Sequence, residues 1–178
     1  MSQRNSGYDR IEFDEYPTPA WVTEAVIPYI PPHIRSVWEP AAGEGKMADV
    51  LTDNGFDVAS SDIQTGNDFF SKRICIVDAI ITNPPYSLAQ EFIEHALDLV
   101  RDQQGLVAMI LRCDFDHAKT RRNLFSDNKA FTRKLILTRR IRWIEGSTGS
   151  PSFNHAWYVW DWRNMKDPTI SYHFGGTK

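Results

Sequence analysis

The strongest constraint on the fold is an uninterrupted apolar run near the middle of the chain, "LVAMIL", at residues 106–111. A strand with one face in water alternates apolar and polar residues, whereas this run contains no polar position. We therefore expect a strand over 106–113 that is buried on both faces, as in the middle of a parallel sheet. Helices cover both sides of such a sheet, which predicts an α/β fold.

Short apolar runs alternate with helical patterns on both sides of this strand, and Gly, Pro and Asn separate them. The expected further strands are 36–41, 57–62, 78–83 and 134–139, and the expected helices are 17–30, 47–55, 87–105 and a charged one around 117–127. The runs 155–162 and 169–174 flank an Asp167-Pro168 turn, which predicts a C-terminal antiparallel hairpin. Together these elements predict a three-layer αβα sandwich with a Rossmann-like, mostly parallel seven-stranded sheet.

Length and composition favour a single domain over residues 1–178, since 178 residues with 42% hydrophobic content form one core comfortably and two poorly. Residues 1–15 are polar and are expected to be a flexible N-terminal segment, unlike a secretory signal.

No apolar run approaches the ~20 residues of a membrane span, so we expect a cytoplasmic protein with no membrane contact. Cys75 and Cys113 are far apart in sequence and the histidines lack ligand spacing, so no metal is expected.

Charge is distributed unevenly along the chain. Residues 1–100 carry 6 Lys/Arg and 16 Asp/Glu, whereas residues 101–178 carry 14 and 7. Ten basic residues fall between 112 and 142, which is typical of a phosphate-binding face and equally compatible with a solvated surface. The nucleic-acid-binding candidates are Arg121, Arg122, Arg139, Arg140 and Arg142.

A glycine loop follows the first predicted strand, in "EPAAGEG" at residues 39–45. Gly43 and Gly45 let the backbone approach a ligand that a Cβ would block, and Asp62 ends the next strand, where a carboxylate can accept ribose hydroxyls. The pattern predicts a nucleotide-type cofactor. Ala48 occupies the third position of a dinucleotide fingerprint, so the loop alone does not exclude NAD; a turn glycine and a capping Asp are the plain alternatives.

The most informative motif is Asn83-Pro84-Pro85-Tyr86, which directly follows the strand predicted at 78–83. Open α/β sheets bind ligands at this end of their strands. The two prolines stiffen the backbone, so the Asn83 side-chain oxygen and the Pro84 carbonyl can accept both hydrogens of an exocyclic –NH2 group, while Tyr86 offers a stacking face. Such bonds would localise the nitrogen lone pair for attack on an activated methyl group. A rigid turn that starts a helix at Ser87 is the alternative.

These motifs resemble the class I S-adenosylmethionine-dependent methyltransferases, specifically the N6-adenine DNA methyltransferases with an [D/N/S]-P-P-[Y/F/W] tetrad. The likeness extends from about Tyr16 to Trp162 and suggests a minimal, phage-like form without a separate target-recognition domain. It implies S-adenosylmethionine as cofactor and Asn83, Pro84, Pro85 and Tyr86 as catalytic residues. The cofactor-binding residues it implies are Tyr16, Thr18, Pro19, Glu39, Ala41, Gly43, Gly45, Asp62, Ile63, Asp68, Phe69 and Asn83.

The resemblance predicts DNA as the partner, a target adenine flipped out of the duplex, and room for a partner subunit that recognises the site. Phe153 or Trp143 is expected to stack on the flipped base, and the region 147–157 to form a loop near the site. Three alternatives stay open: methylation of a protein glutamine N5 amide, methylation of an RNA base, and an inactive module that only binds S-adenosylmethionine or DNA.

Overall fold

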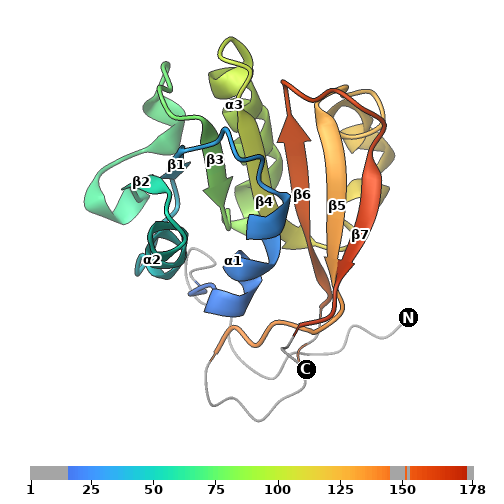
Figure 1. The fold of residues 1–178 in the computed structure, drawn as a ribbon, viewed down its shortest axis with the longest axis horizontal. Helices are drawn as coiled ribbons and strands as arrows, with labels where there is room; N and C mark the ends of the chain where they lie inside the picture. The colour runs from blue at the N-terminus through green and yellow to red at the C-terminus, as the bar shows by residue number, and fades with distance from the viewer. Residues whose placement is uncertain (1–15, 145–150, 152, 176–178) are drawn as a thin grey trace.

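Seven strands form one mixed sheet in the computed structural model, which describes residues 16–144, 151 and 153–175 (Figure 1). The strand order is β2-β1-β3-β4-β6-β5-β7. The strands are β1 (Ser36–Glu39), β2 (Asp57–Ser60), β3 (Ala79–Thr82), β4 (Leu106–Arg112), β5 (Phe131–Leu137), β6 (His155–Asp161) and β7 (Thr169–His173). The N-terminal segment 1–15 predicted to be flexible lies outside the described residues.

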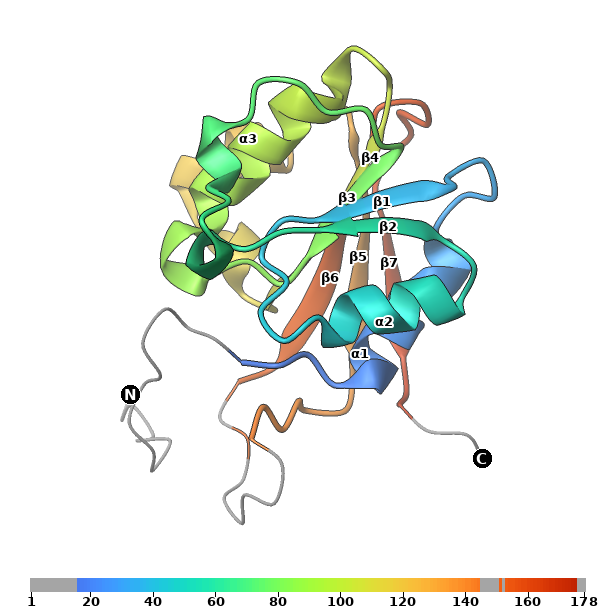
Figure 2. The same ribbon diagram turned by 90° about the vertical axis from the view of Figure 1, so that its left-hand side faces the viewer.

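Helices cover both faces of the sheet. Figures 1 and 2 place α1 (Ala20–Val26) and α2 (Lys46–Asp53) on one face and α3 (Ala89–Arg101) on the other. The predicted three-layer α/β sandwich is therefore confirmed. The connections contain 3-10 turns, namely η2 (Ile27–Tyr29), η3 (Ile63–Thr65), η4 (Phe69–Ser71), η5 (Tyr86–Leu88), η6 (Phe115–His117) and η7 (Lys119–Leu124).

Strand β4 is buried on both faces, as its apolar run predicted. Leu106, Ala108 and Ile110 pack in the core beneath α1 and α2. Val107, Met109 and Leu111 pack in the second core with the buried side chains of α3. All six side chains are at most 1% exposed. Because both faces are apolar, polar groups can appear only at the ends of the central strands.

The predicted C-terminal hairpin is wrong in its pairing. Strand β6 pairs antiparallel with both β4 and β5, and β7 pairs parallel with the far edge of β5. Burial explains this arrangement: every residue of β6 is buried, so both of its edges need partners, and the more apolar β5 takes the inner position. The largely exposed β7 forms the edge of the sheet.

The charged helix expected around 117–127 is also wrong. The chain there forms the short turns η6 and η7. Side chains hold this segment against the sheet, because the Tyr158 hydroxyl donates to Asp116 and the Trp160 indole donates to the Leu124 carbonyl. The Leu124 carbonyl is paired by this indole, so it does not require a helical partner.

The Asp78 carboxylate fixes the amino ends of the central strands. Its Oδ2 accepts hydrogen bonds from the backbone N–H groups of Arg35 (2.8 Å) and Ser36 (2.9 Å) and from the Ser36 hydroxyl (3.0 Å). The Asp78 carbonyl accepts from Leu106 N–H at 3.0 Å, where β4 begins. One residue therefore joins β1, β3 and β4, and its hydrogen bonds, led by the Ser36 backbone, lower the pKa of the carboxyl group.

Replacing Asp78 by Ala is expected to lower the free energy of unfolding by about 1–3 kcal/mol, since it removes the charge-assisted bonds to Arg35 and Ser36 that tie the start of β1 to β3. The carboxylate contributes above its unfolded pKa of about 3.9, so the difference from the parent should shrink as the pH falls below that value. Urea unfolding at neutral and acid pH measures both effects. The control is Asp98→Ala, which removes only an exposed ion pair with Arg101 and should change stability by less than about 1 kcal/mol. Equal stability of the two variants would contradict the role of Asp78.

Candidate active site

A cavity of about 510 Å³ opens at the carboxyl ends of β1 and β3, a size typical of small-molecule sites. It brings together ten of the twelve residues predicted to bind a cofactor, namely Tyr16, Thr18, Glu39, Ala41, Gly43, Asp62, Ile63, Asp68, Phe69 and Asn83. Of the predicted tetrad, Asn83 and Pro85 line the cavity, whereas Pro84 and Tyr86 do not. The segments after β1, β2 and β3 thus meet at one site.

The two remaining residues, Pro19 and Gly45, lie outside the cavity wall and shape the chain beside it. Pro19 immediately precedes α1, and its carbonyl accepts from Val22 N–H at 2.9 Å. Gly45 precedes α2 with a positive φ of 79°, a conformation that favours glycine. Its N–H donates to the Ala42 carbonyl at 2.8 Å, so Gly45 turns the loop into the helix.

Asp62 joins the glycine loop to the end of β2. Its Oδ2 accepts from Gly43 N–H and its Oδ1 accepts from Gln64 N–H, both at 2.9 Å. A carboxylate oxygen can accept more than one hydrogen bond, so each oxygen retains acceptor capacity at the cavity wall. This arrangement suits a ligand that donates hydroxyl hydrogens.

Glu39 places a buried carboxyl group in the cavity wall. The residue is 2% exposed, and its Oε2 has no hydrogen-bond partner among the described residues. Burial raises its pKa to about 8; the Ala48 backbone N–H opposes this shift, and the charges of Asp62 and Asp49 add to it. An unpaired buried carboxyl group is a site for a cationic ligand group, which would restore the lost solvation.

Asn83 emerges directly after β3, whose four residues are all buried. Its Nδ2 donates to the Tyr16 carbonyl at 3.4 Å, and its Oδ1 is buried without a hydrogen-bond partner in the described part of the chain. Such an acceptor costs stability unless a ligand supplies a donor. The geometry therefore offers one fixed acceptor at the cavity wall, next to the rigid Pro84-Pro85 segment.

Aromatic residues close the cavity on the α3 side. The Phe69 ring stacks on Phe92 at 4.7 Å between centroids, and Phe70 meets Phe92 edge-on at 5.1 Å. Asp68 stabilises the η4 turn that presents both rings, since its Oδ1 accepts from Phe70 N–H at 2.9 Å. The result is an apolar wall beside the acidic groups, suited to a flat ring.

Several lining residues were not predicted from the sequence: Pro17, Pro40, Ala42, Glu44, Lys46, Met47, Gln64, Phe70, Ser87, Leu88 and Phe92. Most are direct neighbours of predicted residues, so adjacency was an available signal. Phe92 was not identifiable in this way because it lies inside α3, where the helical pattern predicts only core packing.

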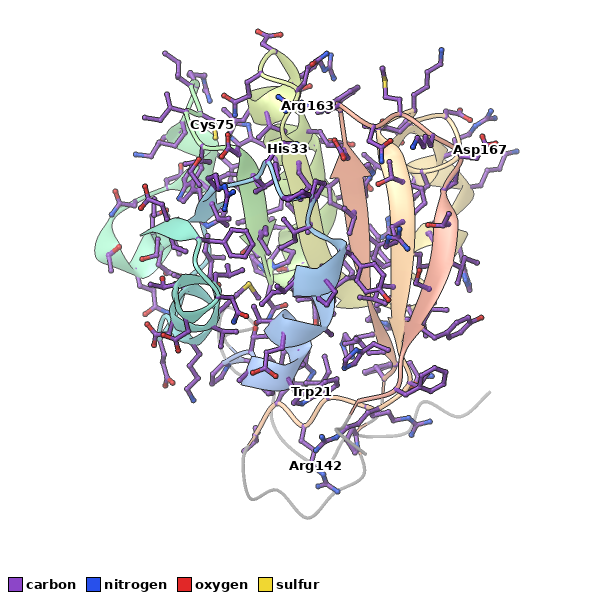
Figure 3. All side chains as sticks on the ribbon, in the orientation of Figure 1. Trp21, His33, Cys75, Arg142, Arg163 and Asp167 are labelled. Carbon is purple, nitrogen blue, oxygen red and sulfur yellow. The ribbon has the colours of Figure 1, made fainter. Side chains whose placement is uncertain are left out.

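The predicted nucleic-acid residues divide into two groups. Arg139, Arg140 and Arg142 are exposed and follow β5. They lie at the end of the sheet where the parallel strands β3 and β4 also finish. Figure 3 shows Arg142 at the same end of the molecule as Trp21, far from Cys75 and Arg163. Arg140 donates to the Asn154 side chain and to the Pro151 carbonyl, while Arg139 lies 5.1 Å from the Trp21 ring.

Arg121 and Arg122 lie elsewhere, in η7 behind β5 and β7 in Figure 1. Arg122 is paired with Asp127 at 2.6 Å, and Arg121 stacks 3.9 Å from the Phe115 ring. The η7 carbonyl of Leu124 contacts the Trp160 indole near the carboxyl end of the antiparallel β6, away from the cavity edge. The clustering of Arg121 and Arg122 with the other arginines in sequence is not matched in space.

Phe153 and Trp143 were predicted to stack on a flipped base. Phe153 is 47% exposed and packs on the Arg112 guanidinium at 4.1 Å, and the half-buried Trp143 contacts the Tyr86 ring at 6.4 Å. Both residues thus lie near the carboxyl ends of β3 and β4, where the tetrad lies. Their contact with a base stays a prediction. The predicted loop over 147–157 is too long at its end, because residues 155–157 belong to β6; residues 147–150 and 152 lie outside the described residues.

Within residues 16–144, 151 and 153–175, no group of three or more His, Cys, Asp or Glu side chains could hold a metal ion. In the same ranges, no helix is long and apolar enough to cross a membrane. Cys75 and Cys113 are free and half-buried, and burial raises the pKa of both thiols.

The fold has clear structural relatives. The methyltransferase subunit of a type I restriction-modification system from Streptococcus thermophilus matches with a TM-score of 0.61 and 12% identity, over 87% of this chain and 46% of that one. A putative class I S-adenosylmethionine-dependent methyltransferase from Listeria monocytogenes matches with a TM-score of 0.58 and 11% identity, over 93% and 68%. This chain has the class I methyltransferase fold.

A modification subunit of a putative type I restriction enzyme from Vibrio vulnificus YJ016 matches with a TM-score of 0.57 and 14% identity, over 83% of this chain and 44% of that one. The chain therefore spans less than half the length of either restriction-modification subunit. At sequence identities of 11–14%, the likeness to these structures establishes the fold alone. No family model matches the sequence, and no curated protein matches it.

Replacing Glu39 by Gln is expected to stabilise the protein increasingly as the pH rises. The folded protein keeps the Glu39 proton to about pH 8, whereas the unfolded chain releases it near 4.5. The contribution of Glu39 to the free energy of unfolding is therefore complete below its unfolded pKa. Above that pH the contribution falls by up to about 1.4 kcal/mol per pH unit until the folded pKa is reached.

Thermal unfolding at several pH values between about 5 and 8 measures this effect, because Gln has no proton to lose. Glu44→Gln is the matched control, since Glu44 also lines the cavity and its side chain is 68% exposed. A stability difference between Glu39→Gln and the parent that stays constant over this pH range would contradict a buried, protonated Glu39.

Proposed function

We propose that this protein is an S-adenosylmethionine-dependent methyltransferase that methylates the exocyclic N6 amine of adenine in DNA, with the target base flipped out of the duplex. The observation that carries the proposal is Asn83: its buried side-chain oxygen lies unpaired at the cavity wall where a central strand ends. The Pro84-Pro85-Tyr86 segment that follows gives this acceptor the rigid setting of an amino-methylating site.

The cavity residues fit S-adenosylmethionine. The Glu39 carboxyl group suits the cationic part of the molecule, and Asp62 suits the two ribose hydroxyls. The apolar side chains of Ile63 and Phe69 suit the adenine ring, with the Asp68 carboxylate beside them. Bound S-adenosylmethionine supplies an electrophilic methyl group. The residues Tyr16, Thr18 and Ala41 complete the same wall.

The tetrad acts on the acceptor amine through hydrogen bonds. We expect the Asn83 Oδ1 and the Pro84 carbonyl to accept its two N–H bonds, while Tyr86 contacts the base. These bonds orient the nitrogen lone pair and strengthen as positive charge develops on the nitrogen. No strong general base is needed, because the proton becomes acidic only after the new bond forms.

Two observations support DNA as the acceptor. Three arginines, Arg139, Arg140 and Arg142, are exposed at the end of the sheet that carries the tetrad, where they can contact phosphates, which favours a nucleic acid over a protein. Two of the structural relatives are subunits of restriction-modification systems. Since both relatives are named as subunits, the proposal includes a partner subunit that contributes target recognition.

The direct test is methyl transfer from tritiated S-adenosylmethionine to adenine-containing duplex DNA, structured RNA and a protein extract, followed by mass spectrometry of the labelled atom. Label on adenine N6 of DNA is the expected result. Label on RNA or on a glutamine amide would move the assignment to that acceptor. Cofactor binding without any transfer would indicate a binding module.

Replacing Asn83 by Ala is expected to lower the rate of methyl transfer by roughly a hundredfold or more, because one preorganised acceptor is lost. The affinity for S-adenosylmethionine should change only a few-fold, since the other cavity residues remain. Single-turnover kinetics and calorimetry measure the two quantities. Asn164→Ala, in the exposed turn after β6, is the control. Parent-like transfer by Asn83→Ala would contradict the mechanism.

Replacing Arg139, Arg140 and Arg142 together by Gln is expected to reduce the salt dependence of DNA binding. Each lost phosphate contact lowers the slope of log K against log salt by about 0.9, so up to about 2.7 is expected. Fluorescence anisotropy with a labelled duplex at several salt concentrations measures the slope. The double variant Arg121→Gln, Arg122→Gln should have a slope close to that of the parent, because Arg122 already pairs with Asp127. A smaller salt slope in the Arg121, Arg122 variant than in the Arg139, Arg140, Arg142 variant would place the phosphate-binding face on η7.

A further inference from the structure

Four rings meet beside the tetrad and form a continuous cluster. The Tyr86 ring is stacked on the His155 ring at 5.8 Å with an interplanar angle of 25°. Trp143 packs edge-on against His155 at 5.2 Å and against Tyr86 at 6.4 Å. Tyr16, whose carbonyl accepts from Asn83, lies 6.1 Å from Trp143. The proposed catalytic segment is therefore in contact with two rings, Trp143 and His155, and with the Tyr16 carbonyl.

The ring stacked on Tyr86 comes from a rigid element. His155 is the first residue of β6 and lies opposite Arg112 in the ladder between β6 and β4. It is 3% exposed, and Trp143 packs against its edge. A side chain anchored at the end of a paired strand has little freedom, so it can restrict the motion of a ring on a neighbouring loop.

The imidazole is uncharged at neutral pH. Burial, followed by the charge of Arg112, lowers the pKa of His155 to about 4, against smaller opposing effects from Asp114 and the Phe153 backbone. A neutral imidazole presents a flat, largely apolar face to Tyr86, in the centroid range of about 4.5–7 Å that offset aromatic stacking favours. Its contact with Tyr86 is therefore a packing contact between two flat rings.

We propose that His155, supported by Trp143, is a positioning residue that fixes the plane of the Tyr86 ring. A loop tyrosine samples several rotamers, and a planar acceptor base must meet one of them to align its amine with Asn83. The stack on His155 selects that rotamer before the base arrives, which lowers the entropic cost of alignment. This inference rests on the proposed function, since it assumes that Tyr86 contacts the methylated acceptor.

The chain allows a clean substitution at this position. The His155 Nδ1 is buried without a hydrogen-bond partner among the described residues, so an apolar replacement breaks no bond at that atom. His155→Leu should remain folded while losing the flat ring, and His155→Phe should keep a flat ring. His173→Leu is the matched control, because His173 also stacks on an aromatic ring, Trp21, at 6.3 Å and lies on the edge strand β7.

The first test separates kcat from KM in methyl transfer to an adenine-containing duplex. His155→Leu is expected to lower kcat about tenfold or more, with KM for S-adenosylmethionine changed less than about twofold. His155→Phe should recover most of the rate, and His173→Leu should match the parent. A parent-like kcat for His155→Leu, or a loss of rate in His155→Phe equal to that in His155→Leu, would overturn the proposal.

The second test needs no activity. The protein is labelled with 3-fluorotyrosine, and the Tyr86 resonance is assigned by its absence in Tyr86→Phe. His155→Leu is expected to shift or broaden this resonance, whereas His173→Leu should leave it unchanged. An unchanged Tyr86 signal in His155→Leu would overturn the positioning role. If the parent methylates no acceptor, the proposed function fails, and the fluorine spectra still decide whether His155 fixes the Tyr86 ring.

Discussion

The register of the three central parallel strands is the constraint on which the rest of the structure depends. Asp78 fixes it at the amino ends of β1, β3 and β4 through hydrogen bonds to Arg35, Ser36 and Leu106. In parallel strands, a register fixed at one end also sets the level at which the other ends stop. The polar groups that follow the buried strand cores therefore emerge close together, and the cavity between Glu39 and Asn83 forms at that edge.

Strand β6 contributes to both stability and the site. It inserts antiparallel between β4 and β5 and places Trp157 in one core and Tyr158 and Trp160 in the other, all fully buried. Because it runs opposite to its neighbours, its first residue, His155, lies at the edge where β3 and β4 end. The same strand that fills the core thus supplies the ring that contacts Tyr86.

The parts of the fold and site that the sequence predicts are those that depend on local pattern. The run at 106–111 predicts a doubly buried strand, and the rule that ligands bind at strand carboxyl ends brings Gly43, Asp62 and Asn83 to one edge. Pairing between distant strands has no such signature. The apolar runs near the C-terminus look like a hairpin because they are adjacent, whereas burial of β6 selects β5 as its neighbour.

The same limit applies to individual side chains. Arg121 and Arg139 belong to one basic stretch in the sequence, yet β5 separates them and only Arg139 lies at the end of the sheet where β3 and β4 end. His155 has no motif around it, and its contact with Tyr86 exists only because β6 pairs with β4. Contacts that depend on strand order can be predicted only once that order is known.

The insertion of β6 also determines when the site is completed during synthesis on the ribosome. Residues through α3 and β4 can assemble the cofactor side of the cavity as soon as they leave the exit tunnel. The gap beside β4 and the position next to Tyr86 stay unfilled until residues 155–161 follow. A nascent chain without this strand would expose the apolar edge of β4 and would lack the ring stacked on Tyr86, so it would be prone to aggregation.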